Sequence, residues 1–196
     1  MKLRLLIAGL LAGVVVFFWG FFSHSVLGLG ESSMKSIPNE PAVISALSSN
    51  IAESGFYFFP GAGLGADRLP KEQQEAAMQK WDADYKTLPH GILIVKKPTG
   101  AALPFTKLLL IELGTTVLGG LLAAWLLSLA APSLPSFIGR VFFVAVLGFF
   151  ASVNIDASYW NWYDFPTGYL TSSLIDSTVG WALAGVVLAF MIRPRS

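Results

Sequence analysis

The chain has no cysteine, only two histidines and few charges, and each scarcity excludes a class of function. Without cysteine there is no disulfide, no thiolate metal site and no cysteine nucleophile. With two histidines, a histidine-rich metal or haem site would need other ligands. The net charge of +1 provides no basic face that could displace counterions from a nucleic acid. We therefore expect no metal, no cofactor and no nucleic-acid partner.

The scarcity of charge also defines the class of protein. Charged residues make up 13% of the 196 residues and hydrophobic residues 54%, whereas charges alone reach about a quarter of a soluble domain. Four apolar runs are long enough to cross about 30 Å of hydrocarbon as helices. They cover residues 5–22, 105–131, 137–153 and 170–192. The sequence predicts a mainly α protein, a four-helix transmembrane bundle in contact with the lipid bilayer.

Basic residues near the ends of the runs predict the orientation, because insertion retains them on the cytoplasmic side. These residues are Lys2, Arg4, Arg140, Arg193 and Arg195. Both termini are therefore expected in the cytoplasm, in a multi-pass protein of the bacterial inner membrane. A cleaved signal peptide is the alternative for the first run. We favour an uncleaved anchor, since the apolar stretch continues through FFWGFF with no clear small-x-small cleavage site after it.

The chain divides into three parts on this basis. Residues 1–22 form the first transmembrane helix, residues 23–104 a periplasmic insertion, and residues 105–196 the other three helices with short loops. Within the insertion, NEPAVISALSSNIAESG predicts a helix from a cap at Asn39 to an end at Gly55. FYFFP predicts a strand, a second helix is expected from Pro70, and GILIVKKP predicts a second strand. The insertion is thus a small α+β unit.

Acidic residues within or beside the runs are the most informative signal for a site. Glu112 and Asp176 lie at a similar depth near the outer border, and Asp156 follows the third run. A charge at the centre of a bilayer costs about 3 kcal/mol on insertion scales, so these groups should face the bundle interior, form pairs or be protonated. One interpretation is a proton, cation or cofactor site. The others are an internal ion pair, for which Lys107 is the nearby base, and a pair with a basic group of a partner protein.

An aromatic cluster, SYWNWYDFPTGYL, separates the last two runs. Its rings belong to Tyr159, Trp160, Trp162, Tyr163, Phe165 and Tyr169. Amphipathic rings collect at the lipid–water border, so we expect an outer loop that anchors the bundle at headgroup height. Stacked rings could instead hold a lipid, quinone or pigment, or form the contact with a neighbouring subunit.

Small residues four apart predict close helix packing. Gly9 and Gly13 form such a pair in the first run, and Gly180 and Ala184 form another in the last. Such faces allow two helix backbones to approach in lipid, either within the chain or between chains.

Two further features carry less weight. GAGLG at residues 61–65 lacks the third glycine and the lysine of a phosphate-binding loop, so a flexible turn is the better interpretation. His24 lies where the first run ends and His90 precedes the second predicted strand. Imidazole can ligate metals or carry protons, but a lone histidine at a membrane border more often only forms hydrogen bonds.

Three stretches in this order also carry a resemblance: FFWGFFSHSVLG, PNEPAVISALSSNIAESGFYFFPG and WNWYDFPTGYL. The chain resembles a family of small bacterial inner-membrane proteins that is itself uncharacterised. The resemblance implies four spans and a periplasmic insertion, and it transfers no activity and no catalytic residue.

The sequence assembles no nucleophile with a base and an orienting group, so we expect no enzyme. The first hypothesis is a non-enzymatic accessory or scaffold subunit that packs against other integral membrane proteins. The alternative is a small transport or ligand-binding protein with an acidic vestibule in the outer leaflet. A third hypothesis, an enzyme acting on lipid carriers, would depend on Asp156 and Asp164 at the outer border.

Overall fold

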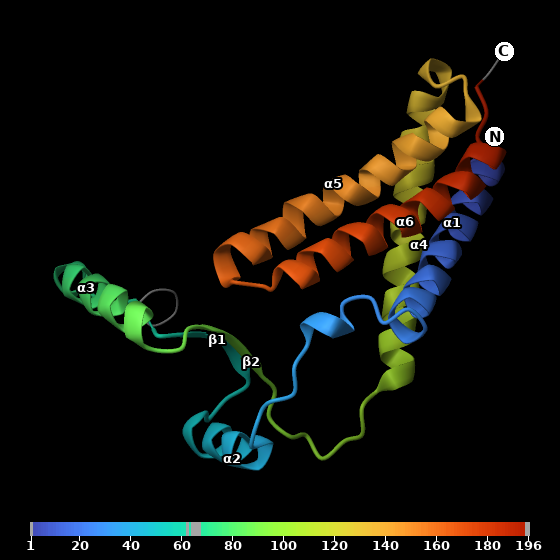
Figure 1. Cartoon of the computed structure of the whole chain (residues 1–196). Helices are drawn as coiled ribbons and strands as arrows, with labels where there is room; N and C mark the ends of the chain where they lie inside the picture. Colours follow the sequence, from blue (N-terminus) through green and yellow to red (C-terminus); the bar gives the residue numbers. More distant parts are fainter. Residues whose placement is uncertain (1, 62, 64–67, 195–196) are drawn as a thin grey trace. The chain divides into compact units, whose positions relative to one another are not determined.

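The computed structural model describes residues 2–61, 63 and 68–194, without the side chains of Lys2 and Ser32. The chain divides into two compact units, one formed by residues 1–35 with 102–196 and the other by residues 36–101. The fold is mainly helical with one small sheet (Figure 1).

The first unit contains the four long apolar helices that the sequence predicts. They are α1 (Lys2–Ser25), α4 (Phe105–Ala130), α5 (Phe137–Tyr163) and α6 (Thr167–Met191). Each is long and apolar enough to cross a membrane. Short 3₁₀ turns, η1 (Glu31–Ser33) and η3 (Ala131–Ser133), follow α1 and α4. The chain therefore has the helices of a multi-pass membrane protein, while the membrane and the side on which each loop lies remain predictions.

The helices pack in two pairs joined through α1 and α6. α1 lies along α4, α5 lies along α6, and α1 also packs against α6, whereas α4 has little contact with α5 or α6. The pairs meet near the chain termini and diverge toward the opposite end (Figure 1). We call this opposite end, which carries Ser25, Phe105, Tyr163 and Thr167, the Ser25 end. The predicted acids Glu112, Asp156 and Asp176 line cavities that are described below.

Glycines allow the backbones of α1 and α4 to come into direct contact. Gly9 and Gly13 of α1 face α4, where Gly120 lies directly against both of them. A methyl group added at Gly9 would come within 2.8 Å of the Leu121 Cα atom, closer than real Cβ atoms approach. This small-residue face therefore packs against another helix of the same chain. Small residues allow such a close approach of two helices in lipid.

The small residues of α6 are also covered within the chain. The indole of Trp19 lies over Gly180, where an added Cβ would be 2.7 Å from its Cδ1 atom. Ala184 is fully buried. On the α5 side, Gly148 lies against the Trp181 ring of α6. Both small-residue faces predicted from the sequence thus serve contacts between this chain's own helices.

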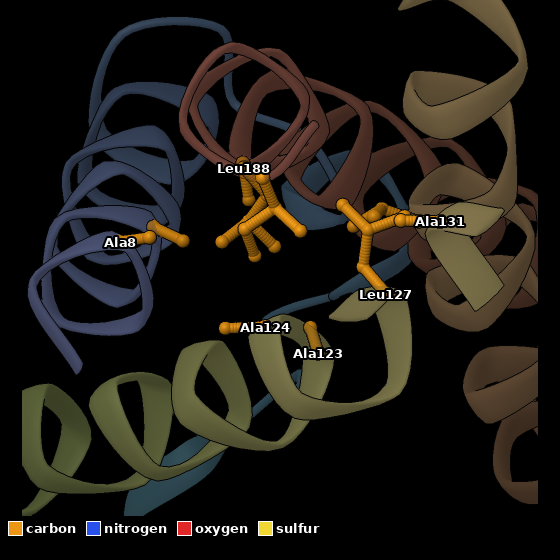
Figure 2. Close-up of a cluster of buried hydrophobic side chains, with 10 residues drawn as sticks. Ala8, Ala123, Ala124, Leu127, Ala131 and Leu188 are labelled. Atoms are coloured by element: carbon orange, nitrogen blue, oxygen red, sulfur yellow. The ribbon is translucent and has the colours of Figure 1, made fainter. Parts of the chain in front are cut away.

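The buried core of the unit lies toward the terminus-bearing end and is built largely of alanine. Figure 2 shows Ala8 of α1, Ala124 and Leu127 of α4, and Leu188 of α6 together, all with no exposed surface. Small side chains let three helices meet closely here.

α5 differs from the prediction in length. It continues to Tyr163 instead of ending near residue 153, so the predicted aromatic loop is wrong for most of its rings. Four of them, Tyr159, Trp160, Trp162 and Tyr163, lie on the last two turns of α5. Helix formation satisfies the backbone hydrogen bonds of this segment internally, which an apolar surrounding requires. Asp164, in the left-handed conformation, ends the helix.

The second unit has the predicted order of elements. It contains α2 (Glu40–Asn50), β1 (Gly55–Phe59), α3 (Lys71–Thr87) and β2 (Gly91–Val95), and the two strands pair antiparallel. Gly55 begins β1 and does not end the first helix as predicted, because α2 stops at Asn50. Neither helix has a buried residue. The GAGLG turn extends over residues 62, 64 and 65, which lie outside the described residues.

Candidate functional site

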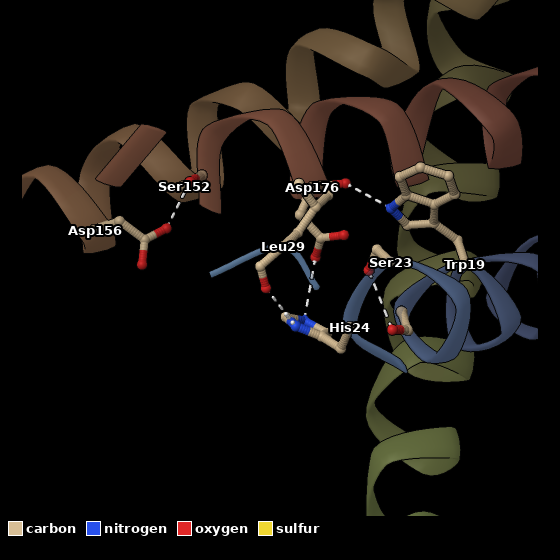
Figure 3. A network of polar contacts seen from close by, with 8 residues as sticks. Trp19, Ser23, His24, Leu29, Ser152, Asp156 and Asp176 are labelled. Atoms are coloured by element: carbon tan, nitrogen blue, oxygen red, sulfur yellow. Dashed lines mark hydrogen bonds and ion pairs between the residues drawn. The ribbon is translucent and has the colours of Figure 1, made fainter. Parts of the chain in front are cut away.

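The site is built around a contact between α1 and α6 near the Ser25 end. The indole N–H of Trp19 donates to the backbone carbonyl of Asp176 at 3.0 Å and fixes the two helices side by side. One turn further along α1, the Nε2 atom of His24 lies 3.7 Å from the Asp176 Oδ2 atom. Figure 3 shows both contacts converging on Asp176. His24 and Asp176, from opposite ends of the chain, thus lie beside each other where α1 packs on α6.

The other nitrogen of His24 determines its tautomer. Nδ1 lies 3.0 Å from the Leu29 carbonyl oxygen, which can only accept a hydrogen bond, so Nδ1 carries the hydrogen and donates (Figure 3). Nε2 is then the nitrogen that gains or loses a proton. When it is protonated it faces the Asp176 carboxylate as an ion pair, and when it is neutral its lone pair faces the same negative charge.

Asp176 is only partly satisfied by this contact. At 3.7 Å the His24 nitrogen is too distant for a hydrogen bond. The second carboxylate oxygen, Oδ1, is buried and has no hydrogen-bond partner among the described residues. The Asp176 side chain is 24% exposed, whereas that of His24 is 62% exposed. The acid is therefore held in place by the helix packing while the imidazole has room to move.

Two adjoining cavities meet at this contact. The first, of about 590 Å³, lies between α1, α4 and α6, and Glu112 and the rings of Trp19 and Trp181 line it. The second, of about 440 Å³, lies between the η1 segment, α5 and α6, and Glu31, Asp156 and Tyr169 line it. His24, Asp176 and Ser177 line both. The first cavity lies within the range of about 300 to 1,000 Å³ that is usual for ligand sites.

The charge of the lining is one-sided. Glu112, Asp176, Asp156 and Glu31 line one or both cavities, and within the described part of the chain no lysine or arginine lines either. Lys107, the predicted partner charge, forms no ion pair with a described residue. The histidine is the group that can supply positive charge, and this arrangement favours a cation or a proton over an anion.

The third predicted acid, Asp156, lies on α5 in the second cavity. Its Oδ2 atom accepts a hydrogen bond from Ser152 at 2.5 Å (Figure 3). The Tyr169 hydroxyl interacts with Asp156 and with Ser173. Asp156 is thus supplied with donors from its own helix and from α6, whereas Asp176 keeps an unpartnered oxygen. The two acids are not equivalent, and Asp176 is the one with capacity for a ligand.

Metal binding has no geometric support here. Among the described residues no three histidine, aspartate or glutamate side chains lie close enough to hold an ion. Asp164, which was considered with Asp156 for a lipid-carrier enzyme, lies at the end of α5 and lines neither cavity.

The aromatic rings form a separate cluster beside the second cavity. Phe165 lies between Tyr159 and Tyr169, with ring centroids 5.4 and 4.9 Å apart. Trp160 donates to the Thr167 hydroxyl at 3.2 Å and so ties α5 to α6. The Trp162 side chain is 72% exposed. Of the six rings, Tyr169 alone lines either of these two cavities, and the cluster mainly closes the α5–α6 turn.

No protein family, curated protein or solved structure matches the chain. The resemblance to an uncharacterised membrane family therefore stays a prediction, and function rests on the geometry of the site.

His24 is the residue whose importance the sequence did not reveal. A signal was present, since a carboxylate in a span requires a counter-charge and His24 lies at the same border as Asp176. The antiparallel packing of α1 on α6 was needed to pair them. His90, by contrast, stacks on Tyr85 in the second unit at 3.8 Å between ring centroids.

Proposed function

We propose that the protein binds organic cations from the outer leaflet of the membrane, in the cavity between α1, α4 and α6. The observation that carries the proposal is the Asp176 carboxylate, with a buried unpartnered oxygen, at the junction of two cavities without lysine or arginine in their described lining. In the predicted orientation, the Ser25 end faces the periplasm.

The composition of the cavity lining supports the class of ligand. Two carboxylates, of Glu112 and Asp176, attract positive charge, and the indole rings of Trp19 and Trp181, which also line the cavity, are side chains of the kind that attract cations. An apolar body with one positive charge matches this combination of acid and aromatic surface. The role is binding, with or without transport, and needs no covalent chemistry.

The accessory role stays a prediction with less support. Its contact surfaces were the small-residue faces, and Gly9, Gly13, Gly180 and Ala184 all pack inside the chain. The other contact surface predicted for it, the aromatic end of α5, is exposed at Trp162. The acidic cavities therefore favour the binding role.

Tetraphenylphosphonium, a permanent apolar cation, tests the proposal by calorimetry on the detergent-purified chain. We expect it to bind at least about tenfold more tightly than uncharged triphenylphosphine oxide, since about 1.4 kcal/mol of charge attraction corresponds to a factor of ten. Glu112→Gln should weaken cation binding by about three- to tenfold, because it removes one nearby charge in a partly solvated cavity.

Asp164→Asn is the matched control, because it neutralises an acid of the same unit that lines neither cavity. It should leave cation affinity unchanged. Equal affinity for the charged and uncharged compounds, or an equal loss in both variants, would contradict the proposal.

A further inference from the structure

We infer that a bound cation and the proton on His24 exclude each other, so that a cation that binds to the protonated site releases one proton. The inference rests on the proposed function and adds the way in which the same site is regulated. It follows from the position of His24 between the two cavities, with its titrating nitrogen toward Asp176.

In the empty site, His24 supplies a counter-charge for Asp176 when it is protonated. Because Nδ1 donates to the Leu29 carbonyl, protonation adds a hydrogen to Nε2, 3.7 Å from the Asp176 Oδ2 atom. The resulting imidazolium neutralises the carboxylate. A cation that enters the first cavity would then face a neutral pair instead of a negative group.

The titratable groups around His24 are mostly acidic, so the competition is between two positive charges, the imidazolium and the bound cation. The titratable groups that line the same cavities as His24 are Asp176 and Tyr169 from α6, Glu112 from α4, Asp156 from α5 and Glu31 from η1. The four carboxyl groups can be anionic, and among the described residues that line the cavities none is a lysine, an arginine or a second histidine. A bound cation therefore raises the free energy of the imidazolium by direct repulsion. It also replaces the imidazolium as the partner of the Asp176 carboxylate.

The step balances as an exchange of charges. The Nε2–H bond of the imidazolium breaks, the electron pair stays on Nε2, and the proton passes to water. The carboxylate of Asp176 keeps its charge and changes its partner from the imidazolium to the ligand. Since 62% of the His24 side chain is exposed, the neutral ring has a path to solvent and room to turn away.

Calorimetry with tetraphenylphosphonium tests this between pH 5.5 and 8, where imidazole and not the usual carboxylate changes charge. We expect affinity to fall by up to about tenfold per pH unit on the acid side, the limit for one linked proton. Titrations in two buffers of different ionisation enthalpy should show release of up to one proton per cation.

His24→Gln should bind the cation with pH-independent affinity and release no proton. His90→Gln is the matched control, because it removes the other histidine, which lies in the second unit, and should behave as the wild type. If His24→Gln does not fold, the two-buffer measurement on the wild-type chain decides alone.

The outcomes separate the two proposals. Cation binding that is independent of pH and releases no proton overturns the exchange and leaves the proposed function standing. A pH dependence that persists in His24→Gln overturns the exchange as well, because another group would then carry the proton. Absence of cation binding at every pH overturns the proposed function itself.

Discussion

Replacing Arg140 with leucine is expected to lower the free energy of unfolding by on the order of 2 to 4 kcal/mol. Arg140 is 5% exposed and lies in the first turn of α5. Its guanidinium donates to the carbonyls of Leu134 and Pro135 at 3.0 and 2.9 Å and to that of Ala189 at 3.3 Å.

Two effects of the leucine substitution oppose each other. Leucine removes a buried charge, which relieves a desolvation cost. It also removes the positive group from carbonyls of the α4–α5 connection, which have no helical partner. The C-terminal turn of α6 loses the same positive group, which its dipole favours. The three lost charge-assisted bonds outweigh the relief, because a hydrogen bond to a charged group contributes about 1.5 to 3 kcal/mol. The Ala189 carbonyl is in addition buried, whereas the other two bonds are partly buried.

Arg140→Lys is the control, since lysine keeps the positive charge that directs insertion but cannot donate to three separated carbonyls in the same way. We expect an intermediate loss, measured by denaturant unfolding in mixed micelles and followed by tryptophan fluorescence. A leucine variant as stable as the wild type would show that this contact does not hold α5 to α6.

The second large effect is expected at Asp176. Asp176→Asn should weaken binding of tetraphenylphosphonium by about ten- to hundredfold, because loss of a charged partner removes about 1.5 to 3 kcal/mol. The backbone carbonyl that accepts from Trp19 is unchanged, so the packing of α1 on α6 should persist. Asparagine has nearly the same shape, which keeps the cavity volume constant.

Binding and unfolding should therefore respond separately in this variant. Cation affinity is measured by calorimetry and stability by denaturant unfolding of the same preparation. Asp156→Asn is the comparison, because Asp156 already accepts from Ser152 and its loss should affect affinity less. An Asp176 variant with wild-type affinity would place the ligand elsewhere.

Much of the fold follows from local sequence properties. Apolar length alone located the four long helices, and the strands FYFFP and GILIV were marked by their composition. The end of α5 was missed because polar and aromatic residues after position 153 resemble an interfacial loop. Periodicity cannot distinguish such a loop from a helix whose rings pack on one another.

The same local properties of the sequence predicted only part of the site. The cost of a carboxylate in a span identified Glu112 and Asp176, since that cost is a property of each residue alone. The partner of Asp176 depends on which helices touch, and the sequence favoured Lys107 where the structure brings His24. The burial of Arg140 likewise depends on contact with α6. Its guanidinium donates to the carbonyl of Ala189, which is 49 positions away in the sequence.

The absence of native cysteine permits the most direct test of the account. Thr115→Cys introduces one thiol into the wall of the first cavity, and Thr106→Cys places one in the exposed first turn of α4 outside both cavities. A cationic thiol reagent applied to the periplasmic side should modify both thiols, and tetraphenylphosphonium should slow the reaction at position 115 but not the reaction at position 106. Modification of position 115 that occurs only from the cytoplasmic side, or that the cation does not slow, would contradict an outward-facing cation site.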